Sequence, residues 1–333
     1  MELLDDKVNF ESFSKRHELG SDLLPARSFE EGLIDEFHGD KARLGLNMPW
    51  RALNWFDIRP HETTVWTGYN GHGKSLILGH VILSLMDQGE KAAIASMEMT
   101  AQKTMARMAR QALRSYIPGA EDLAKFSEWT DGKLWILNKQ ESVHWEKIIG
   151  VINYAIEEHG VTQFVVDSMM KCGISPDDQN AESAFMENLT GVSQATGCHI
   201  HLVAHGRKPF DERVRMTKYE IRGTGHISDK ADNVIIMSRN IERERALKNN
   251  PTEDQIERYK NQPDAWLTVD KQRHGTGELG DLWLFYNTDS TSYCTRPNCA
   301  PVHILREFKD EPFSEDEGDQ DTERGDSVSG GDI

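Results

Sequence analysis

The sequence has few cysteines, no long apolar run and no excess of positive charge. Four cysteines among 333 residues are too few for a disulfide framework, which favours a reducing, cytoplasmic setting. No stretch approaches the roughly 20 apolar residues that a membrane span needs. The acidic start of the chain also has no apolar segment of the kind found in secretory signals. Because 38% of the residues are hydrophobic, we expect a packed core and no membrane partner.

The formal net charge is −17, with 55 acidic residues against 38 Lys and Arg. Eleven of those acids and only two of those bases lie in residues 307–333, so the rest of the chain is mildly acidic. Such a body cannot surround a nucleic acid with positive potential unless its basic residues are concentrated locally. Residues 307–333 contain too few apolar side chains to form a core, which predicts a disordered acidic tail. The tail serves either as a solubility device or as a docking segment for a basic partner.

Residues 1–54 form a mostly polar first zone with one helix signal. Ser28, followed three residues later by Glu31, fits a capping box, in which the serine accepts a hydrogen bond from an amide of the first turn. Leu33 and Ile34 then contribute to an apolar stripe on a short helix. This region is either an arm that docks on a neighbouring subunit or a surface helix of its own domain, and the sequence leaves both open.

Strand and helix signals alternate through residues 55–306, which we interpret as one α/β domain. Strands that alternate with helices predict a mostly parallel sheet covered on both faces. Near the end, residues 265–269 and 282–286 flank a glycine-rich stretch and predict an antiparallel hairpin. The predicted strands of the alternating part are 63–67, 91–95, 163–166, 199–203 and 233–237, and the predicted helices are 74–86, 101–116, 145–158 and 181–195.

One glycine-rich segment matches a phosphate-binding loop. Residues 68–75 read G-Y-N-G-H-G-K-S and fit G-x-x-x-x-G-K-[ST], placed as required between a predicted strand and a predicted helix. Glycines let backbone amides turn toward phosphate oxygens, and the helix start adds its positive dipole end. Lys74 would reach the β- and γ-phosphates, and the Ser75 hydroxyl would bind Mg²⁺. The predicted nucleotide-binding residues of this loop are Gly68, Asn70, Gly71, His72, Gly73, Lys74 and Ser75.

Two carboxylates complete the chemistry predicted for this loop. Asp167 ends the apolar run 163–166, at the sheet edge where phosphates bind, and is the predicted second anchor of Mg²⁺. Glu98 follows the strand that comes after the phosphate-loop helix, where a carboxylate can face the γ-phosphate and orient or deprotonate water. Taken alone, Glu98 would be read as an exposed residue at a strand end.

Several motifs follow one another in order along residues 50–286. Besides the phosphate loop, they lie at 53–65, 96–99, 165–168, 201–209, 221–235, 239–240 and 271–277. Together they resemble the hexameric replicative helicases with a RecA-type core, the DnaB group, and more closely the phage T7-like and mitochondrial Twinkle helicases. The resemblance implies a RecA-like P-loop NTPase core. Two features depart from the family pattern: Ser238 replaces a glutamate, and the spacing of the last motif is altered.

The resemblance implies roles that spacing alone does not assign. Glu98 would be the catalytic base, and His205, at the end of a strand, would contact the γ-phosphate. Lys271 and Arg273 would act in the catalytic site of a neighbouring subunit, with Arg273 as an arginine finger that stabilises charge on the transferred phosphoryl group. The residues implied to bracket the nucleotide base are Arg239 and Tyr286.

By the same resemblance, the protein would be a ring-forming helicase that unwinds duplex DNA and moves 5′ to 3′ on single-stranded DNA. Its hydrolysis of nucleoside triphosphate would depend on Mg²⁺ and be stimulated by DNA. The fuel would be ATP or another NTP or dNTP, and a hexamer is the expected homo-oligomer. If a phage encodes the chain, the cytoplasm would be that of the host.

Residues 206–222 hold six bases against three acids, the local excess that phosphate binding needs in this chain. In the resembled family this stretch lines the channel of the ring and contacts the backbone of one strand. A solvated charged loop would be the simpler interpretation without the ATPase motifs around it. A second family loop would lie near 171–180, where two aspartates argue against a DNA role. The predicted DNA-binding residues are Arg207, Lys208, Arg213, Arg215, Lys218, Arg222, Gly223 and Gly225.

The sequence shows no sign of the primase that T7-like proteins often carry. Only 67 residues precede Gly68, and no Cys-x-x-Cys pair is present. We therefore expect a separate primase, and a polymerase is the family-based partner for the acidic tail. Cys294, Cys299 and His303 lie close together, but their spacing fits no standard zinc site, so we interpret them as structural.

Three other functions remain open. A RecA-type recombinase or mediator would form nucleotide-gated filaments on single-stranded DNA. A P-loop kinase would act on a small molecule, and a scaffold would bind nucleotide without turnover. Electron microscopy distinguishes rings from filaments, and DNA-stimulated hydrolysis would exclude the kinase.

Overall fold

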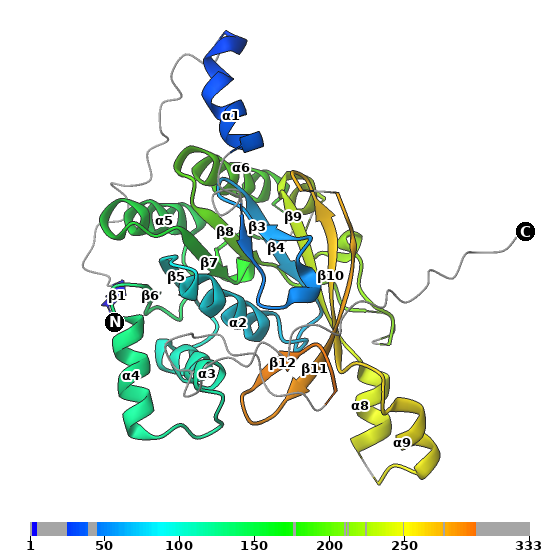
Figure 1. Cartoon of the computed structure of the whole chain (residues 1–333). Helices are drawn as coiled ribbons and strands as arrows, with labels where there is room; N and C mark the ends of the chain where they lie inside the picture. Colours follow the sequence, from blue (N-terminus) through cyan, green and yellow to red (C-terminus); the bar gives the residue numbers. More distant parts are fainter. Residues whose placement is uncertain are drawn as a thin grey trace, which may run out of the picture.

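A ten-stranded sheet runs through the part of the chain that the structure, a computed structural model, describes (Figure 1). The described residues are 2–4, 25–38, 45–175, 178–209, 211, 213–223, 225–248, 250–275 and 277–297. The strand order is β1-β6-β5-β7-β8-β4-β9-β10-β11-β12. The strands are β1 (Glu2–Leu4), β4 (Thr63–Thr67), β5 (Ala92–Ser96), β6 (Leu134–Leu137), β7 (Gln163–Asp167), β8 (His199–Val203), β9 (Asn233–Arg239), β10 (Ala265–Gln272), β11 (Gly280–Asn287) and β12 (Ser292–Cys294).

The sheet is parallel over most of its width. All neighbouring pairs from β1 to β9 are parallel, and those from β9 to β12 are antiparallel. Every residue of β4, β5, β7 and β8 is buried, which is typical of parallel strands covered on both faces. The predicted α/β fold with a mostly parallel sheet and a C-terminal antiparallel hairpin is therefore confirmed.

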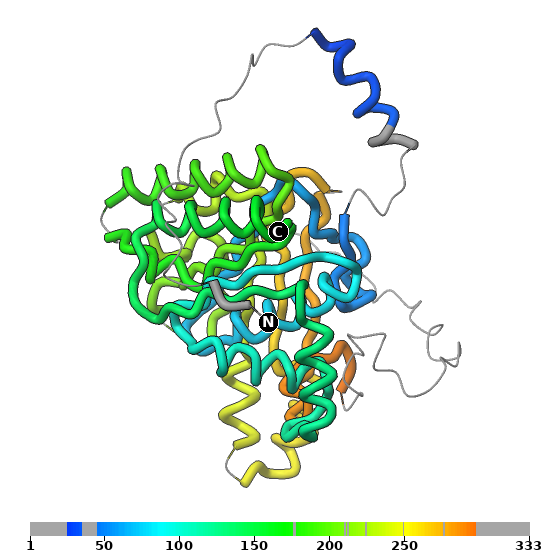
Figure 2. Tube along the Cα trace, turned by 90° about the vertical axis from the view of Figure 1, so that its left-hand side faces the viewer, coloured from blue at the N-terminus to red at the C-terminus, as the bar shows by residue number. Residues whose placement is uncertain are grey.

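Helices cover both faces of the sheet and create two apolar cores (Figures 1 and 2). Successive strand residues point to opposite faces, so Trp66 packs in one core while its neighbour Val65 packs in the other. The first core is closed by α2 (Lys74–Asp87), α3 (Ala101–Leu113) and α4 (Ala120–Thr130). The second is closed by α5 (Trp145–His159), α6 (Gln179–Thr196) and α7 (His226–Lys230).

The five strands and four helices predicted in the alternating part are all present, with ends that differ by a few residues. The largest difference is α3, which ends at Leu113 because Arg114 adopts a left-handed conformation with φ of 52°. The sequence did not predict α4, β6 or β12. It also missed the helical hairpin of α8 (Ile241–Lys248) and α9 (Glu253–Tyr259), which projects from the body in Figure 1.

The helix α1 (Glu30–His38) is present as predicted, but its start differs from the predicted capping box. A 3₁₀ turn, Ala26–Phe29, precedes it, and Ser28 lies inside this turn. The Ser28 hydroxyl donates to the Pro25 carbonyl at 2.6 Å, so the predicted role of Ser28 as a hydrogen-bond acceptor at the cap is wrong. The side chains of Leu33 and Ile34 are exposed, and α1 stands apart from the sheet in both views (Figures 1 and 2). Whether α1 is a docking arm stays open.

Part of the segment expected to form the arm belongs to the packed core. Two short strands, β2 (Leu46–Asn47) and β3 (Asp57–Ile58), pair with each other, and Trp50 and Leu53 between them are buried. The division into an arm, a body and an acidic tail stays a prediction, and residues 307–333 lie outside the described residues. Within the described helices, none combines the length and apolarity that crossing a membrane requires.

Candidate functional site

The phosphate loop connects β4 to α2 at the carboxyl edge of the sheet. Gly68, Gly71 and Gly73 have φ angles of 150°, 78° and 91°, which glycine adopts far more readily than other residues. A Cβ on Gly68 would lie 2.3 Å from the Met237 carbonyl oxygen on β9, so a side chain there would push the loop away from the sheet. Among the described residues no side chain caps the start of α2, so its first amides remain available to an anion.

Lys74 is buried beside this loop, with 5% of its surface exposed. Its Nζ donates to the carbonyl oxygens of Gly68 at 2.9 Å and Tyr69 at 3.1 Å. Burial lowers the pKa of Lys74 to about 8, and the carboxylates of Asp167 and Glu98 partly oppose this shift. A phosphate bound in the loop would compensate the buried ammonium charge, as the predicted role of Lys74 requires.

Asp167 ends β7 at the same edge and is 5% exposed. Burial raises the pKa of its carboxyl group, while a hydrogen bond with Ser75 lowers it. Its Oδ1 has no hydrogen-bond partner within the described part of the chain. One or two oxygen ligands from the protein, completed by phosphates and water, are the set that Mg²⁺ prefers. The residues present therefore fit Mg²⁺, which Ser75 and Asp167 would hold and which would keep Asp167 ionised.

Glu98 lies at the centre of a cluster formed where strands and the phosphate loop end. Its Oε1 accepts a hydrogen bond from the Ser168 hydroxyl at 2.5 Å and lies 3.1 Å from His205 Nε2. The other ring nitrogen of His205 lies 2.5 Å from Asn70 Oδ1. The hydrogen bond from His205, and then that from Ser168, lowers the pKa of Glu98 to about 2 despite partial burial. Glu98 is thus ionised at neutral pH and can orient water, but it is a weak proton acceptor.

Arg239, the last residue of β9, lies against the phosphate loop. Its guanidinium donates to the Gly71 carbonyl oxygen at 3.0 Å and pairs with Glu244 of α8 at 2.5 Å. The backbone amide of Arg239 also donates to the ring of His72 at 3.2 Å. A cavity of about 560 Å³ lies beside this arginine and is lined by the phosphate loop, by α8 and by Tyr286. The structure therefore brings Arg239 and Tyr286 to the phosphate loop.

Lys271 and Arg273 lie at the opposite end of the sheet from their own phosphate loop. Strand β10 runs antiparallel to β9, and Lys271 pairs with Val234 near the start of β9, whereas Arg239 ends that strand at the loop. A strand rises about 3.3 Å per residue, which separates the Arg273 region from Arg239 by roughly 20 Å. Within one protomer, therefore, neither side chain reaches the phosphate site.

Both basic side chains are held at the end of α7. Lys271 Nζ donates to three carbonyl oxygens there at 2.7 to 2.9 Å. Arg273 donates to the Asp232 carboxylate at 3.0 Å and to the Asp229 carbonyl oxygen at 2.8 Å. Asp232 is 2% exposed and Arg273 is 40% exposed, so Arg273 compensates a buried charge while part of its side chain faces solvent.

The predicted DNA-binding bases fall into two groups. Three of them pair with acids of the same chain, and these ion pairs weaken their attraction for DNA phosphates. The other three, Arg207, Lys208 and Arg222, lie near the phosphate site: two line a cavity of about 510 Å³ beside Arg239, and Arg222 lines a smaller one beside His205. Gly225 precedes α7 directly. The three ion pairs between predicted DNA-binding bases and acids of the same chain are Arg213–Asp211 at 2.8 Å, Arg215–Asp281 at 2.6 Å and Lys218–Asp270 at 3.9 Å.

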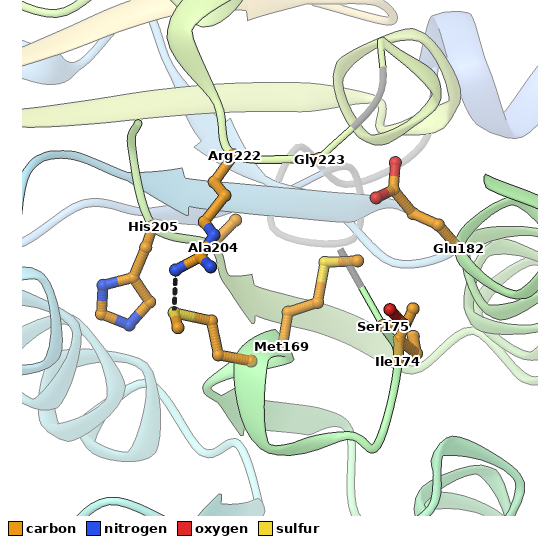
Figure 3. A pocket seen from close by; sticks show the side chains of 9 residues that line it. Met169, Ile174, Ser175, Glu182, Ala204, His205, Arg222 and Gly223 are labelled. Atoms are coloured by element: carbon orange, nitrogen blue, oxygen red, sulfur yellow. Dashed lines mark hydrogen bonds between the residues drawn. The ribbon is translucent and has the colours of Figure 1, made fainter. Parts of the chain in front are cut away.

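A small cavity of about 110 Å³ connects the Glu98 cluster with this basic loop (Figure 3). The Arg222 amide donates to the His205 carbonyl oxygen at 2.8 Å, so the two ends of the loop are bonded together. The Arg222 guanidinium lies 3.8 Å from the sulfur of Met170, the contact dashed in Figure 3. A Cβ on Gly223 would lie 2.3 Å from the Glu182 carboxylate, so the glycine permits this close packing.

Sequence reasoning missed two features of the site. Ser168 directly follows the predicted metal ligand Asp167, and its hydroxyl is the nearest group to Glu98. Its place after a strand-end aspartate was the available signal. The cavity wall formed by α8 had no comparable signal, because its residues carry charges on all sides and give no clear apolar stripe.

Cys294 is buried in β12, while Cys299 and His303 lie outside the described residues. No metal-holding group of three or more His, Cys, Asp or Glu occurs in the described part.

The site combines a glycine-rich loop, placed between a parallel strand and a helix, with a buried aspartate at the end of another parallel strand. This arrangement defines a P-loop NTPase with a RecA-type core. The chain belongs to the AAA domain family, which matches residues 45–211. A curated relative, the chloroplastic and mitochondrial Twinkle homolog of Arabidopsis thaliana, is 23% identical over 290 residues. That match covers 80% of this chain and 38% of the relative, so the chain spans well under half of the relative's length.

Two solved structures share the fold. One is an ATPase domain, which superposes with a TM-score of 0.65 at 14% identity, covering 81% of this chain and 99% of that domain. The other is a DnaB-like replicative helicase, solved in a study of its interactions with primase. It gives a TM-score of 0.62 at 12% identity, covering 82% of this chain and 68% of that one. The resemblance to the DnaB group that the sequence motifs indicated is thereby confirmed.

Proposed function

We propose that the protein is an NTP-hydrolysing helicase that assembles as a ring and moves along single-stranded DNA. The observation that carries this proposal is that the predicted catalytic residues lie at two opposite edges of the sheet. Lys74 and Glu98 lie at one edge, and Lys271 and Arg273 lie roughly 20 Å away at the other. A ring of identical copies would place Arg273 of each copy at the phosphate site of the next.

In the proposed reaction the phosphate loop binds the triphosphate, and Lys74 and the amides at the start of α2 neutralise its charge. Bound Mg²⁺ would supply further positive charge on the phosphates. Ionised Glu98, fixed by Ser168 and His205, would orient the attacking water. An arginine from the neighbouring copy would stabilise the charge that develops during phosphoryl transfer.

The path from hydrolysis to DNA runs through His205. Its ring contacts Glu98 and Asn70, and its carbonyl oxygen accepts the amide of Arg222, which closes the basic loop 206–222. A change in the Glu98 cluster on loss of the γ-phosphate would therefore shift Arg222 and its neighbours Arg207 and Gly223. Contacts with the DNA backbone give little sequence preference and a strong dependence on salt.

The finer assignments rest on the family resemblance. They are a hexameric ring, movement from 5′ to 3′, unwinding of duplex DNA, DNA stimulation, and ATP or another NTP or dNTP as fuel. A separate primase, a polymerase that binds the acidic tail, and a cytoplasmic location belong to the same proposal. Because the chain spans only 38% of the Twinkle homolog, none of that relative's other properties is carried over.

The test compares NTP hydrolysis with and without single-stranded DNA for the wild type and for Glu98→Gln. The amide keeps the size of the side chain but loses the charge, so we expect hydrolysis to fall by about 10²- to 10⁴-fold. Binding of a fluorescent ADP analogue should be unchanged, because ADP lacks the γ-phosphate that Glu98 would face. Glu128→Gln, at an exposed position on α4, is the matched control and should behave as the wild type. Unchanged turnover in Glu98→Gln, or wild-type hydrolysis that DNA does not stimulate, would contradict the proposal.

A further inference from the structure

Tyr293, in β12, points its hydroxyl group at the phosphate loop. The residue is 5% exposed and lines the cavity of about 560 Å³ together with Gly71, Gly73 and Tyr286. A Cβ built on Gly73 would lie 3.3 Å from the Tyr293 hydroxyl oxygen. Gly73 is the residue directly before α2, where the amides that bind phosphate begin.

The ring of Tyr293 is fixed from several sides. Strands β11 and β12 pair Tyr286 with Tyr293, and the two ring centroids lie 5.3 Å apart. The backbone carbonyl of Tyr293 accepts a hydrogen bond from the indole of Trp50 at 3.0 Å. Gln111 of α3 donates to the Thr291 carbonyl oxygen at 3.3 Å, which holds the turn before β12. The hydroxyl is thus presented to the cavity on a rigid support.

The hydroxyl of Tyr293 takes part in no hydrogen bond with any other described residue. The hydroxyl faces the cavity, where a water molecule or a ligand can reach it, and a polar group in such a place normally binds one or the other. Burial raises the pKa of this phenol, which keeps it protonated and therefore able to donate. A phenylalanine would fill the same apolar space but would offer the cavity no hydrogen-bond donor.

We propose that Tyr293 binds the nucleotide directly, its hydroxyl donating a hydrogen bond to an α- or β-phosphate oxygen. The inference rests on the proposed NTPase function and adds a contact that the phosphate-loop motif does not contain. The hydroxyl faces the cavity that Tyr286 also lines, and neither Glu98 nor His205 lines that cavity. Its contact is therefore with the part of the phosphate chain that ADP and ATP have in common.

The test is Tyr293→Phe, which keeps the ring and removes only the hydroxyl. A hydrogen bond to a charged phosphate oxygen contributes enough that its loss should weaken binding of both ADP and a non-hydrolysable ATP analogue by about 10-fold. The KM for ATP should rise by a similar factor while kcat stays within about twofold, because ground state and transition state lose the same contact. Tyr154→Phe, on the opposite face of the sheet in α5, is the control and should change neither constant.

Three outcomes would overturn the inference. If Tyr293→Phe and the wild type bind ADP with equal affinity, the hydroxyl has no nucleotide partner. The proposed function would still hold in that case, provided that the wild type binds and hydrolyses nucleotide. A loss confined to the ATP analogue would place the hydroxyl on the γ-phosphate instead.

If Tyr293→Phe folds poorly, a protein with 3-fluorotyrosine at position 293 is used in its place. The fluorine resonance of that residue should shift on addition of ADP with Mg²⁺, and the absence of a shift would contradict the contact. A wild type that binds no nucleotide would refute the function itself.

Discussion

Replacing Arg273 separates the structural role of this side chain from its proposed action on a neighbouring copy. Arg273→Ala removes the guanidinium that lies 3.0 Å from the carboxylate of Asp232, a residue with 2% exposure. Removing one partner of a fully buried pair costs about 3–5 kcal/mol. The cost is smaller here, because Arg273 is 40% exposed, His274 lies 3.5 Å from the same carboxylate, and the Thr63 amide still donates to it. We expect the free energy of unfolding to fall by about 1–2 kcal/mol.

Arg273→Lys keeps the positive charge beside Asp232 but loses the planar guanidinium. It should lower the unfolding free energy by less than about 1 kcal/mol and still reduce DNA-stimulated hydrolysis by about 10³-fold, because lysine does not replace an arginine finger. Urea unfolding followed by tryptophan fluorescence measures the first effect, and steady-state phosphate release measures the second. Near-normal hydrolysis by Arg273→Lys would refute the catalytic role. Unchanged stability of Arg273→Ala would refute the structural one.

Three further predictions concern the core, the Glu98 cluster and the basic loop. Within the described residues neither ring nitrogen of His80 has a partner, and burial lowers its pKa to about 3. In the unfolded state His80 binds a proton near pH 6.5, whereas in the folded state it does not. Between pH 7.5 and 5.5 this one histidine should therefore lower the unfolding free energy of the wild type by about 1.4 kcal/mol, and His80→Leu should not show this loss. Urea unfolding at both pH values measures the difference. In Ser168→Ala, Glu98 keeps the hydrogen bond from His205 and loses the second one that lowers its pKa. The acid limb of the hydrolysis profile should therefore move upward by about one pH unit, and an unmoved limb would argue against Glu98 as its origin. Lys208→Ala should reduce the slope of log K for single-stranded DNA against log salt by about 0.7, and an equal slope would exclude a phosphate contact.

The parts of the fold that the sequence predicted correctly have local signals. The strands at 63–67 and 199–203 are short runs rich in β-branched or apolar residues, and the phosphate loop has its own fixed spacing. Their order along the chain then allows few arrangements other than a parallel sheet with its loops at one edge. For the same reason the sequence alone could place Glu98 and Asp167, each at a strand end, beside Lys74.

The parts that it did not predict depend on contacts between distant residues. Arg215 and Asp281 are 66 residues apart, so a count of charges within 206–222 could not show that this base is already paired. Tyr293 meets Gly73 only because β12 folds back beside β11. The hairpin α8–α9 had one signal that was overlooked, the capping box formed by Thr252 with Gln255.

Ser28 shows the opposite error, a local pattern that the structure does not use. The capping motif was correct in composition, but the chain begins α1 with a 3₁₀ turn, in which the Ser28 hydroxyl donates to the Pro25 carbonyl. Short serine side chains bond to nearby backbone groups in several ways of similar energy. Composition alone therefore does not select one of them.

If the next copy in a ring completes each catalytic site, mixing two inactive variants should restore hydrolysis. Lys74→Ala has no working phosphate loop but keeps Arg273, whereas Arg273→Lys keeps the loop and lacks the finger. If rings assemble at random from equal amounts, about one quarter of the interfaces join an intact loop to an intact Arg273. We expect NTP hydrolysis in the mixture and in neither variant alone. If the mixture forms rings by sedimentation and yet hydrolyses no more NTP than its separate components, the next copy does not complete the site.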